Sequence, residues 1–114
     1  MAELRSALLA LHKSLLAAER RQVERVHGRL GNAEFLQIVS DPVRYGWLKP
    51  FTELLLHFDE EEYAGDLVVD ARELLLPPKA ETPFGRRYLS LMQREPGLVV
   101  DHRTVTRLLE RRPG

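Results

Sequence analysis

The chain has no cysteine among its 114 residues, which excludes disulfide bonds, thiolate zinc sites, iron–sulfur clusters and a cysteine nucleophile. Neither sign of charge is in excess, because 17 basic residues balance 17 acidic ones. A neutral chain has no overall field that attracts nucleic acid or an anionic membrane. The sequence also lacks a signal-peptide pattern and any uncharged run near the ~20 residues that cross a bilayer. We therefore expect a cytoplasmic protein with no membrane partner.

Signals for β-strands are missing as well. No segment alternates apolar and polar residues for long, and no Asn-Gly or Asp-Gly pair favours a hairpin turn. The hydrophobic share of 44% recurs at helical spacing instead and suffices for one core. The sequence predicts an all-α protein with a single domain over residues 1–114. Its architecture is a compact bundle of five or six mostly antiparallel helices with a long N-terminal helix.

The longest predicted helix covers residues 4–27 and carries two neighbouring apolar stripes. The first stripe, which we expect to face the core, consists of Leu4, Leu8, Leu11, Leu15, Ala18 and Gln22. The second stripe consists of Leu9, Leu16 and Val23. Because two stripes exceed what a single packing contact needs, we expect the second one to form the surface of a homodimer.

Proline and capping residues divide the middle of the chain. Asn32 is placed to cap a short helix that ends near Ser40. Asp41 followed by Pro42 is typical of a helix start, so a third helix should begin there. Pro50 lies inside the apolar pattern of that helix, which predicts a kink or a one-turn break.

Three further helix starts are predicted in the second half. The acidic run 59–62 favours the positive N-terminus of a helix dipole, so the next helix should begin there and run to Leu76. Thr82 followed by proline predicts another start. The last helix should begin at Pro96 or be capped by Asp101.

Four polar residues are candidates for a buried polar or ligand-binding cluster. His12 and Glu19 lie within the apolar arc of the first helix, so each needs a partner if it is buried. Glu53 and His57 lie at the edge of the apolar face of the third helix and are placed to supply those partners. A buried glutamate beside a histidine provides an acid–base pair. The alternatives are a structural polar network or boundary positions with the charged ends in water.

The sequence assigns no catalytic residue, metal ligand or cofactor. Glu24 and His27 have the spacing of a di-iron motif, but the second copy that such sites require is missing. A histidine beside the helix-ending Gly28 is also favourable without a metal, because it complements the helix dipole.

Nucleic-acid binding is a further alternative that we do not favour. Its candidates are four arginines at helical spacing in the last helix: Arg103, Arg107, Arg111 and Arg112. Pro96-Gly97 and the apolar residues after it predict a linker longer than the turn of a helix-turn-helix. The net charge of +4 in residues 79–114 is also modest for a nucleic-acid surface.

Charge is divided unevenly along the chain. Residues 1–31 carry a net charge of +3 and residues 32–78 carry −7. These segments can pack side by side and compensate each other. Alternatively, the acidic segment forms a charge-matched surface for a partner.

The most distinctive string runs from Trp47 to Phe51 around Pro50, and it predicts a rigid elbow that anchors the core in preference to a binding platform for an apolar ligand. It belongs to an arrangement that resembles a family of small uncharacterised bacterial helical proteins over most of the chain. The residues that carry the resemblance are Leu8-x-x-Leu11-His12-Lys13, Trp47-Leu48-x-Pro50 with Glu53-Leu54, and Phe84-x-Arg86-Arg87-Tyr88-Leu89. The resemblance implies a bacterial cytoplasmic origin and no particular activity.

Taken together, the sequence predicts a non-enzymatic helical interaction or regulatory module that self-associates and binds an unknown protein partner. The alternatives are a small-ligand or metal-binding bundle and, less favoured, a DNA-binding protein that uses the basic last helix.

Overall fold

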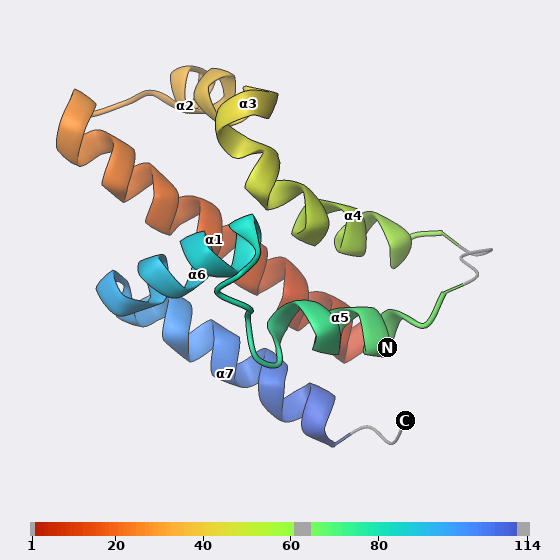
Figure 1. The fold of residues 1–114 in the computed structure, drawn as a ribbon. Helices are drawn as coiled ribbons and strands as arrows, with labels where there is room; N and C mark the ends of the chain where they lie inside the picture. The colour runs from red at the N-terminus through yellow and green to blue at the C-terminus, as the bar shows by residue number, and fades with distance from the viewer. Residues whose placement is uncertain (1, 61–64, 112–114) are drawn as a thin grey trace.

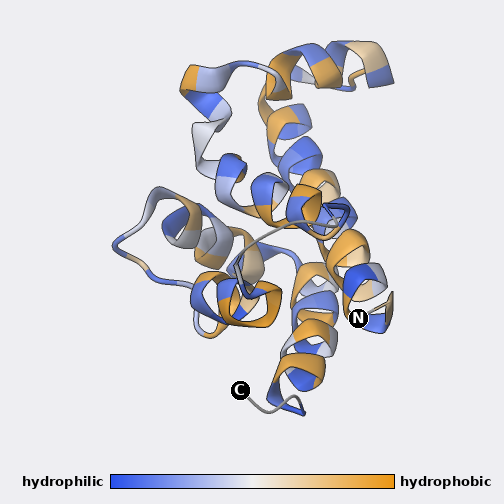
Figure 2. Ribbon diagram, turned by 90° about the vertical axis from the view of Figure 1, so that its right-hand side faces the viewer, coloured by the Kyte–Doolittle hydropathy of each residue, from blue (hydrophilic) through white to orange (hydrophobic). Residues whose placement is uncertain are grey.

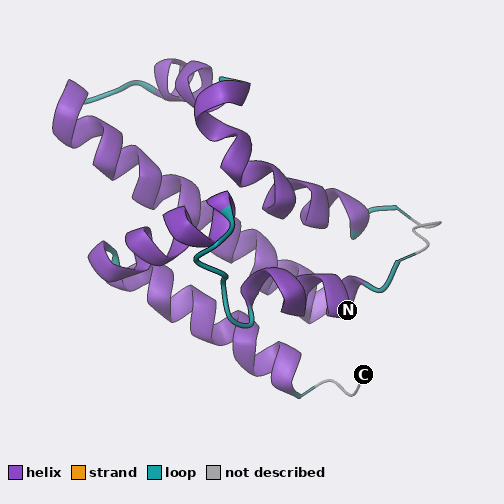
Figure 3. Cartoon of the chain, in the orientation of Figure 1, coloured by secondary structure: helices purple, strands orange, loops and turns teal. Residues whose placement is uncertain are grey.

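The computed structural model describes residues 2–60 and 65–111. Within these ranges the chain is helical throughout, with short connections and no strand (Figures 1 and 3). The elements are α1 (Ala2–His27), α2 (Asn32–Val39), α3 (Pro42–Tyr45), the 3-10 turn η1 (Gly46–Leu48), α4 (Lys49–His57), α5 (Leu67–Leu75), α6 (Pro83–Arg94) and α7 (Pro96–Glu110). Six of these helices have eight residues or more, which confirms the predicted all-α bundle. No helix in the described ranges has the length and apolar character to cross a membrane.

The helix starts that depend on local capping are confirmed. Asp41 accepts a hydrogen bond from the backbone N–H of Val43 at 2.9 Å, and Pro42 occupies the first turn of α3. Thr82 caps α6 in the same way, because its hydroxyl oxygen accepts from the backbone N–H of Gly85 at 2.9 Å. These side chains satisfy backbone donors that have no partner inside the helix.

The predicted break near Pro50 is also confirmed. The chain passes from α3 through the tight turn η1 into α4, and Pro50 lies in the first turn of α4, where its missing N–H costs no hydrogen bond. The start of α2 differs by one residue from the prediction. Gly31 takes the capping position in place of Asn32, and its backbone N–H donates to Glu34 at 3.4 Å.

The prediction that the acidic run 59–62 starts the helix ending near Leu76 is wrong for Asp59 and Glu60, the part of the run that the structure describes. Asp59 and Glu60 lie in the turn that follows α4, and residues 61–62 fall outside the described ranges. Helix α5 begins at Leu67 instead, because Asp66 accepts hydrogen bonds from two backbone N–H groups of its first turn. An ion pair of 2.9 Å from Arg5 compensates the charge of Asp59 at the end of α4.

Of the two predicted starts of the last helix, Pro96 is confirmed, and the long linker expected after α6 is wrong. Helix α7 begins at Pro96, so a single residue, Glu95, connects the two helices. Proline suits the first turn, and the burial of Leu98 draws that turn into the core. Arg103, Arg107 and Arg111 are exposed, whereas Arg112 lies outside the described ranges.

Helix α1 lies at the centre of the packing. It contacts α4, α6 and α7, and both α4 and α7 run in the direction opposite to α1 (Figure 1). The helices are amphipathic, with hydrophobic and hydrophilic residues on different faces of the same turns (Figure 2). The stripe that was expected to face the core does so, except for the partly buried Gln22. Its fully buried leucines are Leu4, Leu8, Leu11 and Leu15.

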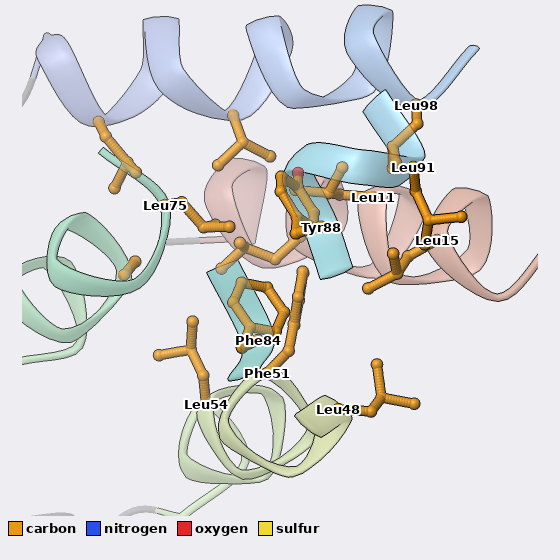
Figure 4. Close-up of a cluster of buried hydrophobic side chains, with 14 of the residues drawn as sticks. Leu11, Leu15, Leu48, Phe51, Leu54, Leu75, Phe84, Tyr88, Leu91 and Leu98 are labelled. Carbon is orange, nitrogen blue, oxygen red and sulfur yellow. The ribbon is translucent and has the colours of Figure 1, made fainter. Parts of the chain in front are cut away.

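Aromatic residues fill the space between α1, α4 and α6. Phe51 and Phe84 meet edge to face with ring centroids 5.9 Å apart, and Phe84 stacks on Tyr88 at 5.1 Å (Figure 4). Leu75 from α5 and Leu98 from α7 belong to the same cluster. This core fixes α4 against α6, and both helices contribute walls to the candidate site.

Candidate binding groove

The structure separates the four polar candidates into three places. The ring of His12 packs edge-on against Phe51 with centroids 5.4 Å apart, and burial lowers the pKa of His12. Its Nε2 atom is buried, and no group among the described residues hydrogen-bonds to it. The expectation that Glu53 or His57 would supply a partner is therefore wrong for His12.

Glu19 is buried, with 6% of its surface exposed, and belongs to a separate network. Arg87 donates to its Oε2 atom from Nη2 at 2.7 Å and from Nε at 3.0 Å. Tyr45 donates to its Oε1 atom at 3.2 Å, and burial together with the charge of Glu19 raises the pKa of Tyr45. The partners come from α3 and α6, so this is a structural link between α1 and these helices.

The glutamate and histidine at the end of α1 also serve local structure. Glu24 accepts a hydrogen bond from the backbone N–H of Leu30 at 2.8 Å and lies 3.7 Å from Arg20. His27 is exposed. Among the described residues, no group of three or more His, Asp or Glu side chains is arranged to hold a metal ion.

The three residues of the expected dimer stripe differ in exposure. Leu9 is 42% exposed, Leu16 is partly buried against the core, and Val23 is only 7% exposed. Val23 lies one turn after Glu19, on the side of α1 that Tyr45 and Arg87 cover. Homodimerisation stays a prediction, and Leu9 is the most accessible residue of the stripe that was expected to mediate it.

Glu53 and His57 do come together, in an open cavity of about 400 Å³ between α4, α5 and the loop before α6. They are one turn apart on α4 and therefore share a face. Asp70 and Glu73, three residues apart on α5, line the same cavity, and Lys79 lines it from the loop. The acidic end of the groove is thus lined by three carboxylates together with Lys79.

A second cavity of about 580 Å³ lies beside the first. The two share Pro50, Leu74 and Thr82 as walls, and together these adjacent cavities are called the groove. The aromatic end of the groove is lined by the half-buried Trp47 and the buried Phe84, whose ring centroids lie 6.4 Å apart. Trp47 thus packs against the core, as predicted, and also forms the floor of a cavity.

Local backbone features hold the walls of the groove in place. The turn η1 buries Leu48 in the core and leaves its neighbour Trp47 at the groove. On the other side, the loop before α6 crosses directly over Gly85, where an added Cβ would lie 1.9 Å from the carbonyl oxygen of Lys79. Only glycine permits this approach. The hydroxyl of Thr82 donates to the same carbonyl at 2.9 Å.

The ends of the groove differ in charge. Glu53 lies 3.7 Å from Lys49, in an ion pair that is largely exposed and therefore weak. Arg44 lines the aromatic end, opposite in sign to the carboxylates of the acidic end. The groove therefore has an apolar middle between a negative and a positive end, which suits a ligand of matching pattern.

Comparison of the chain with protein-family models, with curated proteins and with solved structures finds no match. No activity is therefore carried over from a relative, and the function is argued from the groove itself.

The sequence pointed to only part of the groove. Glu53 and His57 were candidates because they lie one turn apart, and the acidic middle segment was a candidate partner surface. Asp70, Glu73 and Lys79 were missed, because only the packing of α5 against α4 brings them to the same cavity.

Proposed function

We propose that this protein is a non-enzymatic interaction module that binds a segment of a partner protein in the groove between α4 and α5. The observation that carries the proposal is that an aromatic cavity, lined by Trp47 and Phe84, adjoins a charged one with which it shares three wall residues. An apolar side chain of the partner would be desolvated against the two rings. Protein interfaces owe most of their affinity to a few such buried anchors surrounded by polar contacts.

The placement of the polar groups supports binding over catalysis. Glu53 and Glu73 lie on exposed helix faces at the rim of the groove. Water screens exposed carboxylates, so they select and orient a charged ligand. Acid–base catalysis uses groups whose surroundings exclude water.

The proposal retains two expectations from the sequence. A location in the cytoplasm agrees with the absence of cysteine, since disulfides are rare in that compartment. A homodimer would use Leu9 and the exposed part of Leu16 on α1, away from the groove.

The chain offers a direct test, because Trp47 is its only tryptophan and lies in the groove. Peptides would be selected on the 114-residue chain from a random phage-displayed library and then titrated while Trp47 fluorescence is recorded. We expect a shared large apolar residue among the selected peptides and a blue shift of Trp47 emission on binding.

Two glycine variants show whether such binding occurs in the groove. Gly46 lines the aromatic end, and a Cβ there meets no atom within 4 Å, so Gly46→Phe adds a ring at the lip of the groove. Gly97 on α7 is equally open and lies outside the groove, which makes Gly97→Phe the matched control. We expect Gly46→Phe to weaken binding at least tenfold and Gly97→Phe to leave it unchanged. Equal binding to both variants, or no enriched peptides, would overturn the proposal.

A further inference from the structure

We propose that the segment bound in the groove carries a lysine or arginine next to its apolar anchor, on the side that faces α5. This inference rests on the proposed function and specifies its ligand: a basic, apolar segment of a partner protein. It follows from the charges at the two ends of the groove.

The aromatic end of the groove suits the apolar anchor of the partner segment. Phe84 is 2% exposed and forms a fixed wall, because it is held between Phe51 and Tyr88. Trp47 is only half-buried and keeps an accessible part of its ring at the cavity. A large apolar side chain that covers this part loses its contact with water and gains contact with both rings. The anchor therefore occupies the aromatic end.

The acidic end of the groove suits the basic residue. Carboxylates approach the same cavity from two helices, with Glu53 on α4 and both Asp70 and Glu73 on α5. A guanidinium or ammonium group in this cavity can bond to carboxylates of both helices. Because Glu53 and Glu73 are exposed, these bonds select and orient the cation more than they add affinity. Lys79 lines the same end and Lys49 pairs with Glu53, so three carboxylates meet two lysines there.

The opposite charges at the two ends of the groove orient the partner segment. Arg44 is exposed at the opposite end of the groove, where it repels a second basic residue and favours an acidic one. The two ends are joined through Pro50, Leu74 and Thr82, so a single short segment spans both. The charges therefore favour one direction of the segment over the other.

The charge of the acidic end also bears on the class of partner. The acidic end belongs to residues 32–78, whose net charge is −7. The carboxylates at this end disfavour the phosphates of nucleic acids and of anionic lipids and favour a basic segment. A protein segment fits, because its side chains supply both an apolar anchor and a neighbouring cation on one chain.

The test uses the selected peptides and one pair of charge variants. Glu73→Lys reverses an exposed charge in the groove, and Glu110→Lys makes the same change at an exposed position on α7 outside it. Peptides selected on the wild-type protein should share a basic residue on one side of the anchor. Their affinity should fall at least tenfold with Glu73→Lys, remain with Glu110→Lys and decrease as salt concentration rises.

A milder variant, Glu53→Gln, keeps the test informative if Glu73→Lys fails to give the helical circular dichroism of the wild type. It should weaken the same peptides by a smaller factor. Peptides with an apolar anchor but no basic residue, or equal binding to the Glu73 and Glu110 variants, would overturn this inference and leave the proposed function standing. Peptides that bind Gly46→Phe as well as the wild type would overturn both.

Discussion

Individual buried polar residues link the helices, and His102 is one of them. The hydroxyl of Tyr88 and Nδ1 of His102 share a hydrogen bond of 2.8 Å. Burial raises the pKa of Tyr88, so its hydroxyl remains protonated. Burial also lowers the pKa of His102, as it does that of His12. Burial therefore favours the neutral form of both imidazoles in the folded protein.

This burial predicts how stability depends on pH. A histidine whose pKa is lower in the folded than in the unfolded chain binds its proton preferentially when unfolded. Stability is therefore complete above the unfolded value of about 6.5 and declines as the pH falls through the folded values. Urea unfolding at pH 7.5 and pH 5 should give a smaller free energy of unfolding at pH 5. His12→Leu should reduce this difference, and an unchanged difference would show that His12 is not responsible.

The Glu19 network predicts a second effect at this scale. Replacing Arg87 by alanine leaves a buried carboxylate with Tyr45 as its remaining partner. Breaking a buried pair in this way costs about 3–5 kcal/mol, and we expect about 2–3 because the Arg87 side chain is itself 32% exposed. Urea unfolding measures this loss. Glu19→Gln retains an acceptor for Arg87 and should cost less; a larger loss for Glu19→Gln would contradict the role assigned to the pair.

At the scale of elements, the loop before α6 depends on one glycine. The backbone of Lys79 packs directly on Gly85, and Thr82 bonds to both residues. The loop carries Lys79 and Thr82 into the groove, so the shape of the site depends on this crossing.

Gly85→Ala should therefore destabilise the protein. The added methyl group collides with backbone, which cannot rotate away, so we expect a loss of about 1–3 kcal/mol in the free energy of unfolding. Gly97→Ala is the control, because it adds a methyl group to an open helical position and should be neutral or stabilising by up to ~1 kcal/mol. Equal effects of the two substitutions, measured by thermal or urea unfolding, would contradict the crowding at Gly85.

The same scale shows what can be predicted from sequence. The starts of α3 and α6 were predictable because Asp41 and Thr82 act on backbone groups two or three residues away. The start of α5 was not, because an acidic run also fits the turn after α4 once Arg5, far away in the sequence, pairs with Asp59. The residues that line the groove were not predictable for the same reason, because they meet only through the packing of α5 against α4.

At the scale of the whole molecule, opposite charges are separated along a chain that is neutral overall. Low net charge favours association between copies, and Leu9 adds an exposed apolar side chain on the long helix α1. Both features agree with the homodimer predicted from the sequence.

Sedimentation equilibrium tests this expectation. The wild-type protein should have the mass of a dimer, and Leu9→Glu should be monomeric, because a charge at the contact would be buried. Leu36→Glu, a change at a more exposed leucine on α2, should leave the dimer intact. A monomeric wild-type protein would exclude self-association without affecting the groove.

The central claim is that the groove between α4 and α5 binds a protein segment with an apolar anchor and a basic neighbour. Its most direct test is the emission of Trp47 during titration with a selected peptide, compared between the wild type and Gly46→Phe. The account predicts a saturable blue shift in the wild type that is lost in Gly46→Phe. Binding that leaves the emission of Trp47 unchanged would contradict it.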